Sequence, residues 1–449
     1  MPHSLRTRRS FLQQLAAGLA VAPFIRSGLL AQEPGAKIRH ATFGTSGMAF
    51  GDVTAIASHS AVEVVAGCDV DDRSTAKFRE KFPNARLYTD FRELLEKEKD
   101  LQTVNVSTPD HMHAPIAMAA LNRGLHVYAQ KPLTHDLFES RRLAEVAREK
   151  KLATQMGIQI HSGSEYRTAV RLIQESAIGK VKEVHTWSSK KWGDTGKMPE
   201  RTDPVPEGLH WDQWLGVCAE RPFIGDGWYH PGSWRKRLDF GTGTFGDMGC
   251  HIYDPVFNAL ALTAPVSVRS EGPAPNEHSW ATDAIIRYVF PGTEFSEGKT
   301  VAVTWYDGDQ RPPEEIQAFG NAGALPDGKP AKLPDQGSIF IGTNGVMVLP
   351  HVGMPRLVGE AVAERKIEPV KGDNHYHQFI DAALGKGRAS ANFDYAGPMT
   401  EAVLLGSVAS RFPATTLEWD AAALRFTNVG DANQFVRRTY RAGWEIPGL

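Results

Sequence analysis

One segment near the start of the chain has the residue types and spacing of a dinucleotide-binding loop. In the run Gly44-Thr45-Ser46-Gly47-Met48-Ala49, the first glycine permits a tight turn and the final alanine permits close packing of the following helix. A serine stands where the fingerprint GxGxxG/A has its second glycine, and the glycine after it lets the backbone approach a pyrophosphate. We expect the cofactor to contact Gly44, Ser46, Gly47, Met48 and Ala49. A simple glycine-rich turn explains the run equally well.

An acidic residue follows this loop at the distance expected for a ribose ligand. Asp69 lies 25 residues after Gly44, at the end of the second apolar segment. A carboxylate there hydrogen-bonds the ribose hydroxyls and repels a 2′-phosphate, so it favours NAD over NADP as the cofactor. Arg73 leaves NADP open as the less favoured cofactor, and a helix N-cap is the alternative role for Asp69.

Two further polar segments follow apolar segments of the same half. They read Thr108-Pro109-Asp110-His111-Met112-His113 and Gln130-Lys131-Pro132. Lys131 lies in a rigid setting between a buried segment and a proline, where its ammonium group could stand beside a reacting hydroxyl or carbonyl group. A solvated loop lysine is the alternative. His111 and His113 have no third ligand within reach in the sequence, so we predict no metal site.

Alternating strands and helices must position these segments. Between residues 37 and 156, short β-branched segments alternate with stretches of helical period. The predicted strands span 38–43, 62–67, 103–107 and 126–129, and the predicted helices span 73–82, 91–98, 114–123 and 138–150. The alternation predicts an α/β fold with a doubly wound parallel sheet. Ligands bind at the carboxyl ends of such strands, so the polar segments should face one crevice.

The second half, residues 157–449, predicts a different kind of sheet. Strand-like segments span 181–187, 284–290, 300–306, 338–342 and 345–349, and helical segments span 379–384 and 399–410. Alternation of apolar and polar residues in these strands is typical of a mostly antiparallel sheet with one covered face. We therefore expect two domains in the α/β class.

Five motifs, in this order, resemble those of the Gfo/Idh/MocA family, whose NAD(P)-dependent members include glucose-fructose oxidoreductase and inositol dehydrogenase. They are the loop at Gly44, Asp69, residues 108–113, Gln130-Lys131-Pro132 in the family's Glu-Lys-Pro position, and Gly246-Asp247-Met248-Gly249-Cys250-His251. The resemblance covers nearly all of the chain after residue 31 and is closest to the family's secreted branch with twin-arginine signals. It implies an N-terminal Rossmann domain, a C-terminal sheet that forms homo-oligomers, and a cofactor site that includes Thr108, Pro109, His113, Gln130 and Lys131.

The last of these motifs supplies candidate catalytic residues. Asp247 and His251 are four residues apart, so on a helix both side chains lie on one face. The resemblance implies that His251 exchanges the proton of the substrate hydroxyl, that Asp247 orients it, and that Lys131 assists. An imidazole suits this role because its ordinary pKa lies near neutral pH. The alternative is a packed helix histidine bonded to Asp247.

An aromatic insert of about residues 190–239 separates the two halves. It contains Trp192, Trp211, Trp214, Trp228, Tyr229 and Trp234, together with three consecutive basic residues at 235–237. Aromatic faces stack on sugar rings, so the insert predicts a carbohydrate site in which Trp192, His230 and Trp234 join Lys131 and His251 in contacting the substrate. A loop packed by its own aromatic residues explains the composition equally well.

The N-terminus resembles a twin-arginine export signal. Residues 1–31 hold four arginines and no acid, with Thr7-Arg8-Arg9-Ser10-Phe11-Leu12 before an Ala/Gly-rich apolar run and a cleavage candidate between Ala31 and Gln32. The apolar run is too short to span a membrane. We expect a periplasmic or secreted protein, the alternative being a basic tail before a short helix.

Composition narrows the function classes further. The 449 residues include 50 basic and 52 acidic side chains, a net charge of −2 that becomes −6 once the signal is removed. A nucleic-acid partner is therefore not expected. Three cysteines, at positions 68, 218 and 250, cannot form a disulfide framework.

Together these observations predict a secreted NAD-dependent enzyme that oxidises a hydroxyl group of a sugar. Two alternatives stay open. One is a glycoside hydrolase or lyase that holds NAD tightly and recycles it through a keto-sugar, since free NAD is scarce outside the cytoplasm. The other is a carbohydrate-binding protein without catalysis, which Ser46 and Gln130 make conceivable because both depart from the usual motifs.

Overall fold

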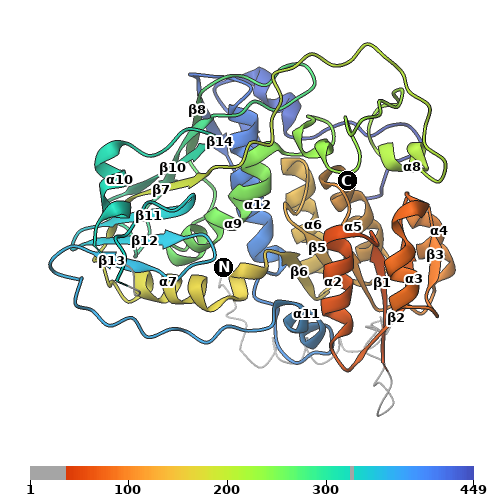
Figure 1. Cartoon of the computed structure of the whole chain (residues 1–449), viewed down its shortest axis with the longest axis horizontal. Coiled ribbons are helices and arrows are strands. Elements are labelled where there is room, and N and C mark those ends of the chain that lie inside the picture. The colour runs from red at the N-terminus through yellow and green to blue at the C-terminus, as the bar shows by residue number, and fades with distance from the viewer. Residues whose placement is uncertain (1–36, 324–327) are drawn as a thin grey trace, which may run out of the picture. The chain divides into compact units, whose positions relative to one another are not determined.

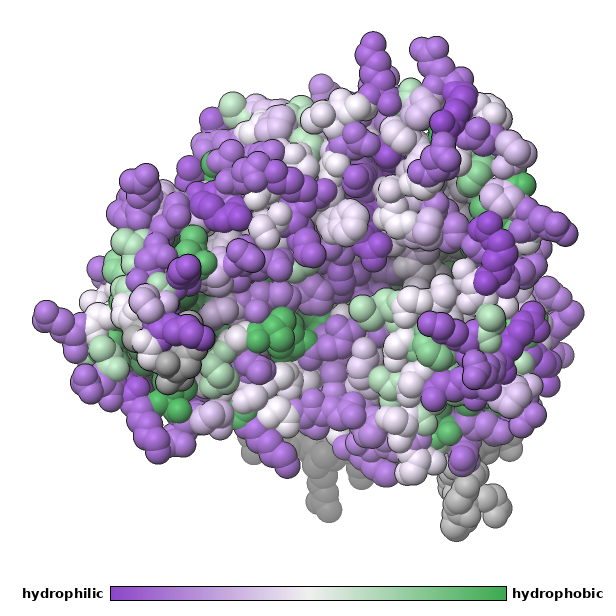
Figure 2. Space-filling view, viewed as in Figure 1, coloured by the Kyte–Doolittle hydropathy of each residue, from purple (hydrophilic) through white to green (hydrophobic). Residues whose placement is uncertain are grey.

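The computed structural model describes residues 37–323 and 328–449. The predicted signal at residues 1–31 lies outside the described residues. Within the described part, no helix is long and apolar enough to cross a membrane. The face of the molecule in Figure 2 is mainly hydrophilic, with scattered hydrophobic patches. Cys68, Cys218 and Cys250 are buried free thiols.

The first domain is built on a six-stranded parallel sheet in the order β3-β2-β1-β4-β5-β6. Its strands are β1 (Ile38–Phe43), β2 (Val62–Cys68), β3 (Arg86–Tyr88), β4 (Thr103–Val106), β5 (His126–Gln130) and β6 (Thr154–Gly157). The predicted doubly wound sheet is confirmed, with β3 and β6 as additional strands. The strand order reverses between β1 and β4, which is where a ligand crevice forms in such sheets.

Within the described residues of the first domain, five helices accompany this sheet. They are α2 (Gly47–Ala57), α3 (Ala76–Lys81), α4 (Phe91–Lys97), α5 (His113–Asn122) and α6 (Leu137–Glu149). The helix predicted at residues 73–82 is divided into a short 3-10 turn, η1 (Asp72–Ser74), and α3. α6 begins with a capping box, because Asp136 accepts from the amide of Glu139 and Glu139 accepts from the amide of Asp136.

The second domain is built on a nine-stranded sheet in the order β13-β12-β11-β7-β10-β9-β8-β14-β15. Its strands are β7 (Val181–Ser188), β8 (Ser267–Glu271), β9 (Ile285–Pro291), β10 (Thr300–Asp307), β11 (Gln336–Gly342), β12 (Val346–Pro350), β13 (Arg356–Val358), β14 (Thr416–Asp420) and β15 (Arg425–Phe426). The β7–β10 pair is parallel and the other neighbouring pairs are antiparallel, which confirms the predicted sheet type.

One face of this sheet is covered by helices. In β9, Ile286, Tyr288 and Phe290 are buried while the residues between them are exposed. Figure 1 shows α9 (Gly243–Ala259) and α12 (Phe393–Ala409) between the sheet and the first domain, with α7 (Ser164–Gln174) below. α12 begins earlier than predicted because Asn392 caps it by accepting from the amide of Asp394. Oligomer formation through this sheet stays a prediction.

A helix from late in the chain packs on the first sheet. α11 (His375–Ala383) begins at Asn374, whose side chain accepts from two amides of the first turn. Its residues Phe379 and Ile380 are fully buried in a cluster with Ile56 and Tyr128 of the first domain. Figure 1 shows α11 beside the lower end of α2. The core of the first domain therefore includes residues from both halves of the chain.

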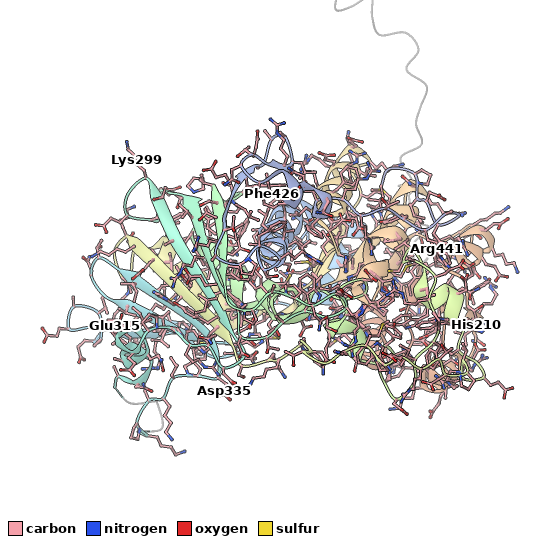
Figure 3. The ribbon with its side chains drawn as sticks, turned by 90° about the horizontal axis from the view of Figure 1, so that it is seen from above. His210, Lys299, Glu315, Asp335, Phe426 and Arg441 are labelled. Carbon is pink, nitrogen blue, oxygen red and sulfur yellow. The ribbon has the colours of Figure 1, made fainter. Side chains whose placement is uncertain are left out.

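The insert at residues 190–239 is largely irregular, with short helical pieces α8 (Trp211–Leu215) and η4 (Ser233–Lys236). The C-terminal segment holds α8 in place, because Arg441 donates to Asp212 at 2.6 Å. Figure 3 shows Arg441 and His210 on the same side of the molecule, far from Lys299 and Glu315 near the second sheet. The insert therefore lies against the first domain.

Candidate functional site

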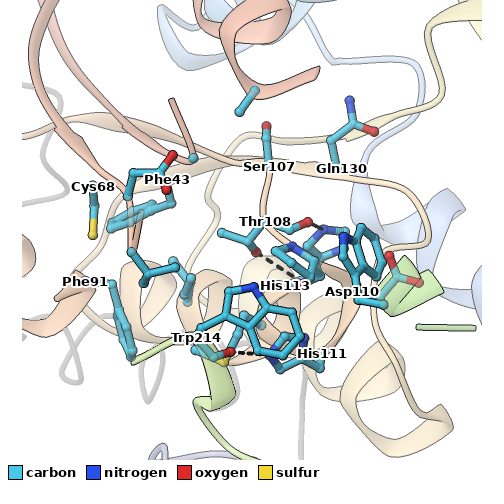
Figure 4. Close-up of a pocket in the computed structure, with 18 of the residues that line it drawn as sticks. Phe43, Cys68, Phe91, Ser107, Thr108, Asp110, His111, His113, Gln130 and Trp214 are labelled. Carbon is cyan, nitrogen blue, oxygen red and sulfur yellow. Dashed lines mark hydrogen bonds between the residues drawn. The ribbon is translucent and has the colours of Figure 1, made fainter. Parts of the chain in front are cut away.

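A cavity of about 380 Å³ opens at the carboxyl ends of β1, β2, β4 and β5. In Figure 4, Ser107 and Gln130 lie on one side of it, opposite Trp214 and His111. The structure brings these predicted site residues to its wall: Gly44, Ser46, Gly47, Met48, Ala49, Asp69, Thr108, Pro109, His113, Gln130, Lys131, His230 and Trp234. Three other predicted residues, Trp192, Asp247 and His251, do not line it.

The glycine-rich loop has the features of an anion cradle. Gly44 has φ of +94°, and a Cβ there would lie 2.6 Å from the Ser107 carbonyl oxygen, so the position requires glycine. Ser46 begins α2 without a capping hydrogen bond from its side chain. A Cβ on Gly47 would meet no atom within 4 Å, so the space before the helix is open. Exposed amides at a helix N-terminus fit the pyrophosphate of a dinucleotide.

Asp69 is fixed against this loop. Its Oδ2 accepts from the amide and the hydroxyl of Thr45 at 2.9 and 2.8 Å, and its Oδ1 accepts from the amide of Asp71 at 3.0 Å. Burial raises the pKa of Asp69. The alternative role as a helix N-cap is wrong, because Asp71 caps η1.

Asp71 engages both the arginine and the histidine predicted near the site. The Arg73 guanidinium donates to it through two nitrogens at 2.7 Å, and His230 Nε2 lies 2.9 Å from its Oδ2. The Arg73 guanidinium is therefore already paired. His230 also lines the cavity, and through Asp71, whose amide donates to Asp69, it is linked to the predicted ribose ligand.

Lys131 and α9 meet at the other end of the cavity. Lys131 Nζ lies 2.6 Å from Asp247 Oδ1 and 3.0 Å from the Asp247 carbonyl oxygen, and Arg235 Nε is 3.5 Å from the same Oδ1. Burial alone would raise the pKa of Asp247, but the Lys131 ammonium offsets this and lowers it. The structure therefore joins two motifs that are 116 residues apart.

His251 lies one turn further along α9. Its Nδ1 is buried and has no hydrogen-bond partner among the described residues. Asp247 was expected to orient His251, but its carboxylate bonds Lys131 instead, because the ammonium is the stronger partner. Burial lowers the pKa of His251 well below its usual value, and Lys131 and His351 lower it further. The His251 ring centroid is 5.6 Å from that of His351, whose Nδ1 is 2.8 Å from the Tyr166 hydroxyl.

Part of the aromatic insert packs on itself, and another part lines the cavity. Trp211 and Trp214 stack at 4.8 Å, so part of the insert is packed by its own aromatic residues. Trp234 lines the cavity, and Arg235 lies over its ring at 4.2 Å and over that of Trp192 at 5.5 Å. Trp192 therefore contacts the site through Arg235. Sequence reasoning did not single out Arg235 as a site residue.

His111 and His113, for which the sequence predicts no metal, lie close to backbone carbonyl oxygens. His113 Nδ1 is 2.7 Å from the Pro132 carbonyl oxygen and its Nε2 is 2.8 Å from that of Thr108, so it joins the loops after β4 and β5. His111 Nε2 is 2.9 Å from the Trp214 carbonyl oxygen, and burial lowers its pKa to about 3. Both rings hold the cavity wall together.

A buried carboxylate behind the glycine-rich loop escaped sequence reasoning. Asp52 of α2 accepts from Ser107 Oγ and Gln130 Nε2 at 2.8 Å and from the Tyr376 hydroxyl at 2.9 Å. Burial raises its pKa. The only available signal was an acid on the apolar face of α2. Gln130 thus contributes its amide to a structural contact while also lining the cavity.

Replacing Asp52 by alanine is expected to lower the free energy of unfolding by roughly 3–5 kcal/mol, because three buried donors lose their acceptor. Asp309→Ala is the control, since Asp309 is exposed and pairs only with Lys191; its effect should stay below about 1 kcal/mol. Equilibrium urea denaturation measures both, and equal effects would contradict the structural role of Asp52.

The comparisons with known proteins agree with this architecture. Residues 38–158 match a family model described as an oxidoreductase family with an NAD-binding Rossmann fold, and residues 172–338 match that family's C-terminal α/β domain. The structure resembles the WlbA dehydrogenase from Chromobacterium violaceum, solved with NADH and UDP-GlcNAcA, with a TM-score of 0.60, 14% identity, and coverage of 86% of this chain and 96% of that one.

Two curated relatives match part of the chain. An uncharacterized oxidoreductase of Schizosaccharomyces pombe is 33% identical over 44% of this chain and 44% of its own length. The levoglucosan dehydrogenase of Pseudarthrobacter phenanthrenivorans is 24% identical over 44% of this chain and 40% of its own length. The chain thus spans less than half the length of either relative. The two domain models together nonetheless match more than half of the chain in one arrangement, so it belongs to the Gfo/Idh/MocA oxidoreductase family, with an NAD-binding Rossmann domain at residues 38–158.

Proposed function

We propose that this chain is an NAD-dependent oxidoreductase that removes a hydride from a hydroxyl-bearing carbon of a sugar or sugar derivative. The observation that carries the proposal is the 2.6 Å contact between Lys131 and Asp247. It holds an ammonium group in the same cavity as the glycine-rich loop and Asp69. Dinucleotide-binding residues and a group suited to proton chemistry therefore share one site.

The residues around the loop support NAD as the cofactor. The open amides at the start of α2 suit the pyrophosphate, and the Asp69 carboxylate suits the ribose hydroxyls. Arg73, which could have favoured a 2′-phosphate, is already paired with Asp71. Bound NAD would supply the hydride acceptor, C4 of its nicotinamide ring.

Lys131 and His251 are the groups proposed to handle the hydroxyl proton. The Lys131 ammonium, fixed by Asp247, can donate a hydrogen bond to the substrate oxygen and stabilise negative charge that develops there. His251 is proposed to take the proton, and its lowered pKa keeps the imidazole neutral at pH 7, the form that accepts a proton. The carbon thus loses a hydride and the oxygen loses a proton, which yields a carbonyl group.

A sugar substrate is supported by the far wall and by the relatives. Trp234 offers an aromatic face, and Arg235 offers donors for hydroxyl groups. One relative is named for levoglucosan, and the similar WlbA structure was solved with UDP-GlcNAcA.

The proposal is tested on protein purified without added cofactor. Mass spectrometry should find bound NAD, and a panel of sugars and aryl glycosides should then yield NADH, or reduction of an added sugar acceptor, without release of aglycone. Aglycone released with no net redox change would replace the proposal by the hydrolase alternative. No bound nucleotide, together with no NAD binding by calorimetry, would favour a non-catalytic carbohydrate-binding protein.

Cofactor choice gives a separate prediction. Asp69→Ser is expected to raise KM for NAD by roughly 10-fold and to narrow the preference for NAD over NADP, since the carboxylate that binds the ribose and repels a 2′-phosphate is removed. Asp72→Ser is the control, because Asp72 is exposed and, among the described residues, its carboxylate pairs with His210 alone. Steady-state kinetics with both cofactors measure the effect. An unchanged NAD/NADP ratio in Asp69→Ser would contradict the role assigned to this carboxylate.

We also propose export through residues 1–31, on the strength of the twin arginines Arg8 and Arg9 before an apolar run. A fusion of this segment to a reporter should appear outside the cytoplasm and should stay inside when both arginines are changed to lysine. Export of the lysine variant at the same level would rule out the twin-arginine route.

A further inference from the structure

A second cavity, of about 390 Å³, lies apart from the candidate site and shares no lining residue with it. It is enclosed by the segment before α6, the last turns of α12, the insert and the C-terminal segment. Its polar lining includes His135, Ser407 and three arginines, at positions 221, 411 and 438. Nothing in the proposed reaction uses this cavity.

Arg411 is the unusual member of this wall. Its guanidinium lies between the rings of Phe435 and Trp280, at 4.4 and 4.9 Å from their centroids. It makes no hydrogen bond or ion pair with any residue that the structure describes. The other two arginines of the wall are paired, Arg221 with Asp239 at 2.5 Å and Arg438 with Glu139 at 3.0 Å.

Two further polar groups in the same wall have no partner among the described residues. Ser407 lies in the last turn of α12, four residues before Arg411. It is only 7% exposed, and its hydroxyl group is unpaired. His135 Nε2 is likewise buried and unpaired. Buried polar atoms are nearly always hydrogen-bonded in folded proteins, so these two unpaired atoms, beside the Arg411 guanidinium in one cavity wall, indicate a missing ligand.

The acids of the wall compensate Arg411 only in part, through the charge of Asp239 at a distance, and none of them forms an ion pair with it. Asp239 is held by Arg221, and Asp136 accepts from the amide of Arg438 at 3.2 Å. The Glu277 side chain is 93% exposed to solvent. Burial lowers the pKa of Arg411 to about 10, so the guanidinium still carries its charge at neutral pH. An incoming anion would therefore meet one positive charge that no contacting carboxylate neutralises.

We propose that this second cavity binds an oxyanion group, a carboxylate or a phosphate, on a molecule of about monosaccharide size. Arg411 would bind the group through its planar fork of N–H donors, and the two aromatic rings hold that plane in position. Ser407 and His135 add hydrogen bonds. The cavity volume of about 390 Å³ has room for a molecule of this size.

Binding of glucuronate and of glucose 6-phosphate, measured by calorimetry and by thermal shift, tests this site. Glucose serves as the uncharged probe, and the two anionic probes distinguish a carboxylate from a phosphate ligand. Arg411→Met should weaken binding of the preferred probe roughly 10-fold or more. Methionine fits between the rings and removes an unpaired buried charge, so the Tm without ligand should stay equal or rise.

Two matched variants locate the binding. Arg425→Met, at the exposed position of β15, should leave the affinity unchanged. Lys131→Met, in the first cavity, should also leave it unchanged. Ser407→Ala removes only the hydroxyl group and should weaken binding as well, which keeps the test decisive if Arg411→Met does not fold.

Three outcomes would overturn the proposal. The affinity for an anionic probe could be the same in Arg411→Met as in the unmodified protein. It could fall in Lys131→Met and not in Arg411→Met, which would place the probe in the first cavity. Finally, glucose could bind as tightly as both anionic probes, or none of the three could bind.

Discussion

Lys131→Met is expected to lower kcat by roughly 100-fold or more, while the affinity for NAD changes by less than about threefold. The substitution keeps the length of the side chain and removes the ammonium group that Asp247 holds in the cavity at 2.6 Å. Without that charge, the substrate oxygen loses the group proposed to stabilise it as its proton leaves. Steady-state kinetics on a substrate from the sugar panel and a fluorescence titration with NAD measure the two quantities.

Two control variants distinguish a catalytic effect of Lys131→Met from an effect on folding. Lys191→Met makes the same substitution at an exposed lysine paired with Asp309, and it should change neither quantity. Loss of Lys131 also leaves the Asp247 carboxylate with Arg235 alone, at 3.5 Å. The double variant Lys131→Met/Asp247→Asn removes this charge, so it should recover thermal stability without recovering kcat. A kcat within threefold of the unmodified protein in either variant would refute the role of Lys131.

Gly44→Ala is expected to lower the free energy of unfolding by roughly 2–4 kcal/mol and to raise the Kd for NAD at least 10-fold. Two independent reasons combine at this position. Its φ of +94° is strained for any residue with a Cβ, and that Cβ would lie 2.6 Å from the Ser107 carbonyl oxygen and 2.8 Å from Ala49 Cβ. Relief of the clash must move the loop that faces the cofactor.

Gly51→Ala is the matched control for this effect. Gly51 lies in the same region, inside α2, and an added Cβ there would meet no atom within 4 Å. Alanine has a higher helix propensity, so this variant should be more stable by up to about 1 kcal/mol and should bind NAD normally. Urea denaturation and calorimetry with NAD compare the two. Similar results for both variants would show that Gly44 has no special backbone role.

Much of the fold follows from local patterns in the sequence. The β-branched segments at residues 38–43 and 103–107 are buried strands because their side chains are apolar on both faces, as parallel strands require. The short edge strand β3 was missed because Arg86–Tyr88 is only three residues long and partly exposed, so it has no apolar run.

The sequence predicts those residues of the candidate site that directly follow a strand or begin a helix. The loop at Gly44, Asp69 and Lys131 were found in this way, since the carboxyl ends of parallel strands share one edge. The pairing of Lys131 with Asp247 could not be derived from either motif alone. It depends on where α9 meets the loop after β5, which packing between the two domains determines.

Residues that act through long-range contacts escaped prediction for a related reason. Asp52 looks like an ordinary polar residue of a helix until Ser107, Gln130 and Tyr376 converge on it from three other parts of the chain. Arg235 became a site residue only because two tryptophans and Asp247 surround it. The spacing of residues along the sequence does not indicate such long-range contacts.

The packing of α11 on the first sheet sets an order of events during synthesis. Phe379 and Ile380 complete a cluster that begins with Ile38, the first residue of β1. The Tyr376 hydroxyl also supplies one of the three donors to Asp52 behind the cofactor loop. The ribosome must therefore translate most of the chain before the hydrophobic core of the first domain can be completed. The two halves mature together, and a nascent N-terminal fragment cannot form a finished cofactor site ahead of the rest.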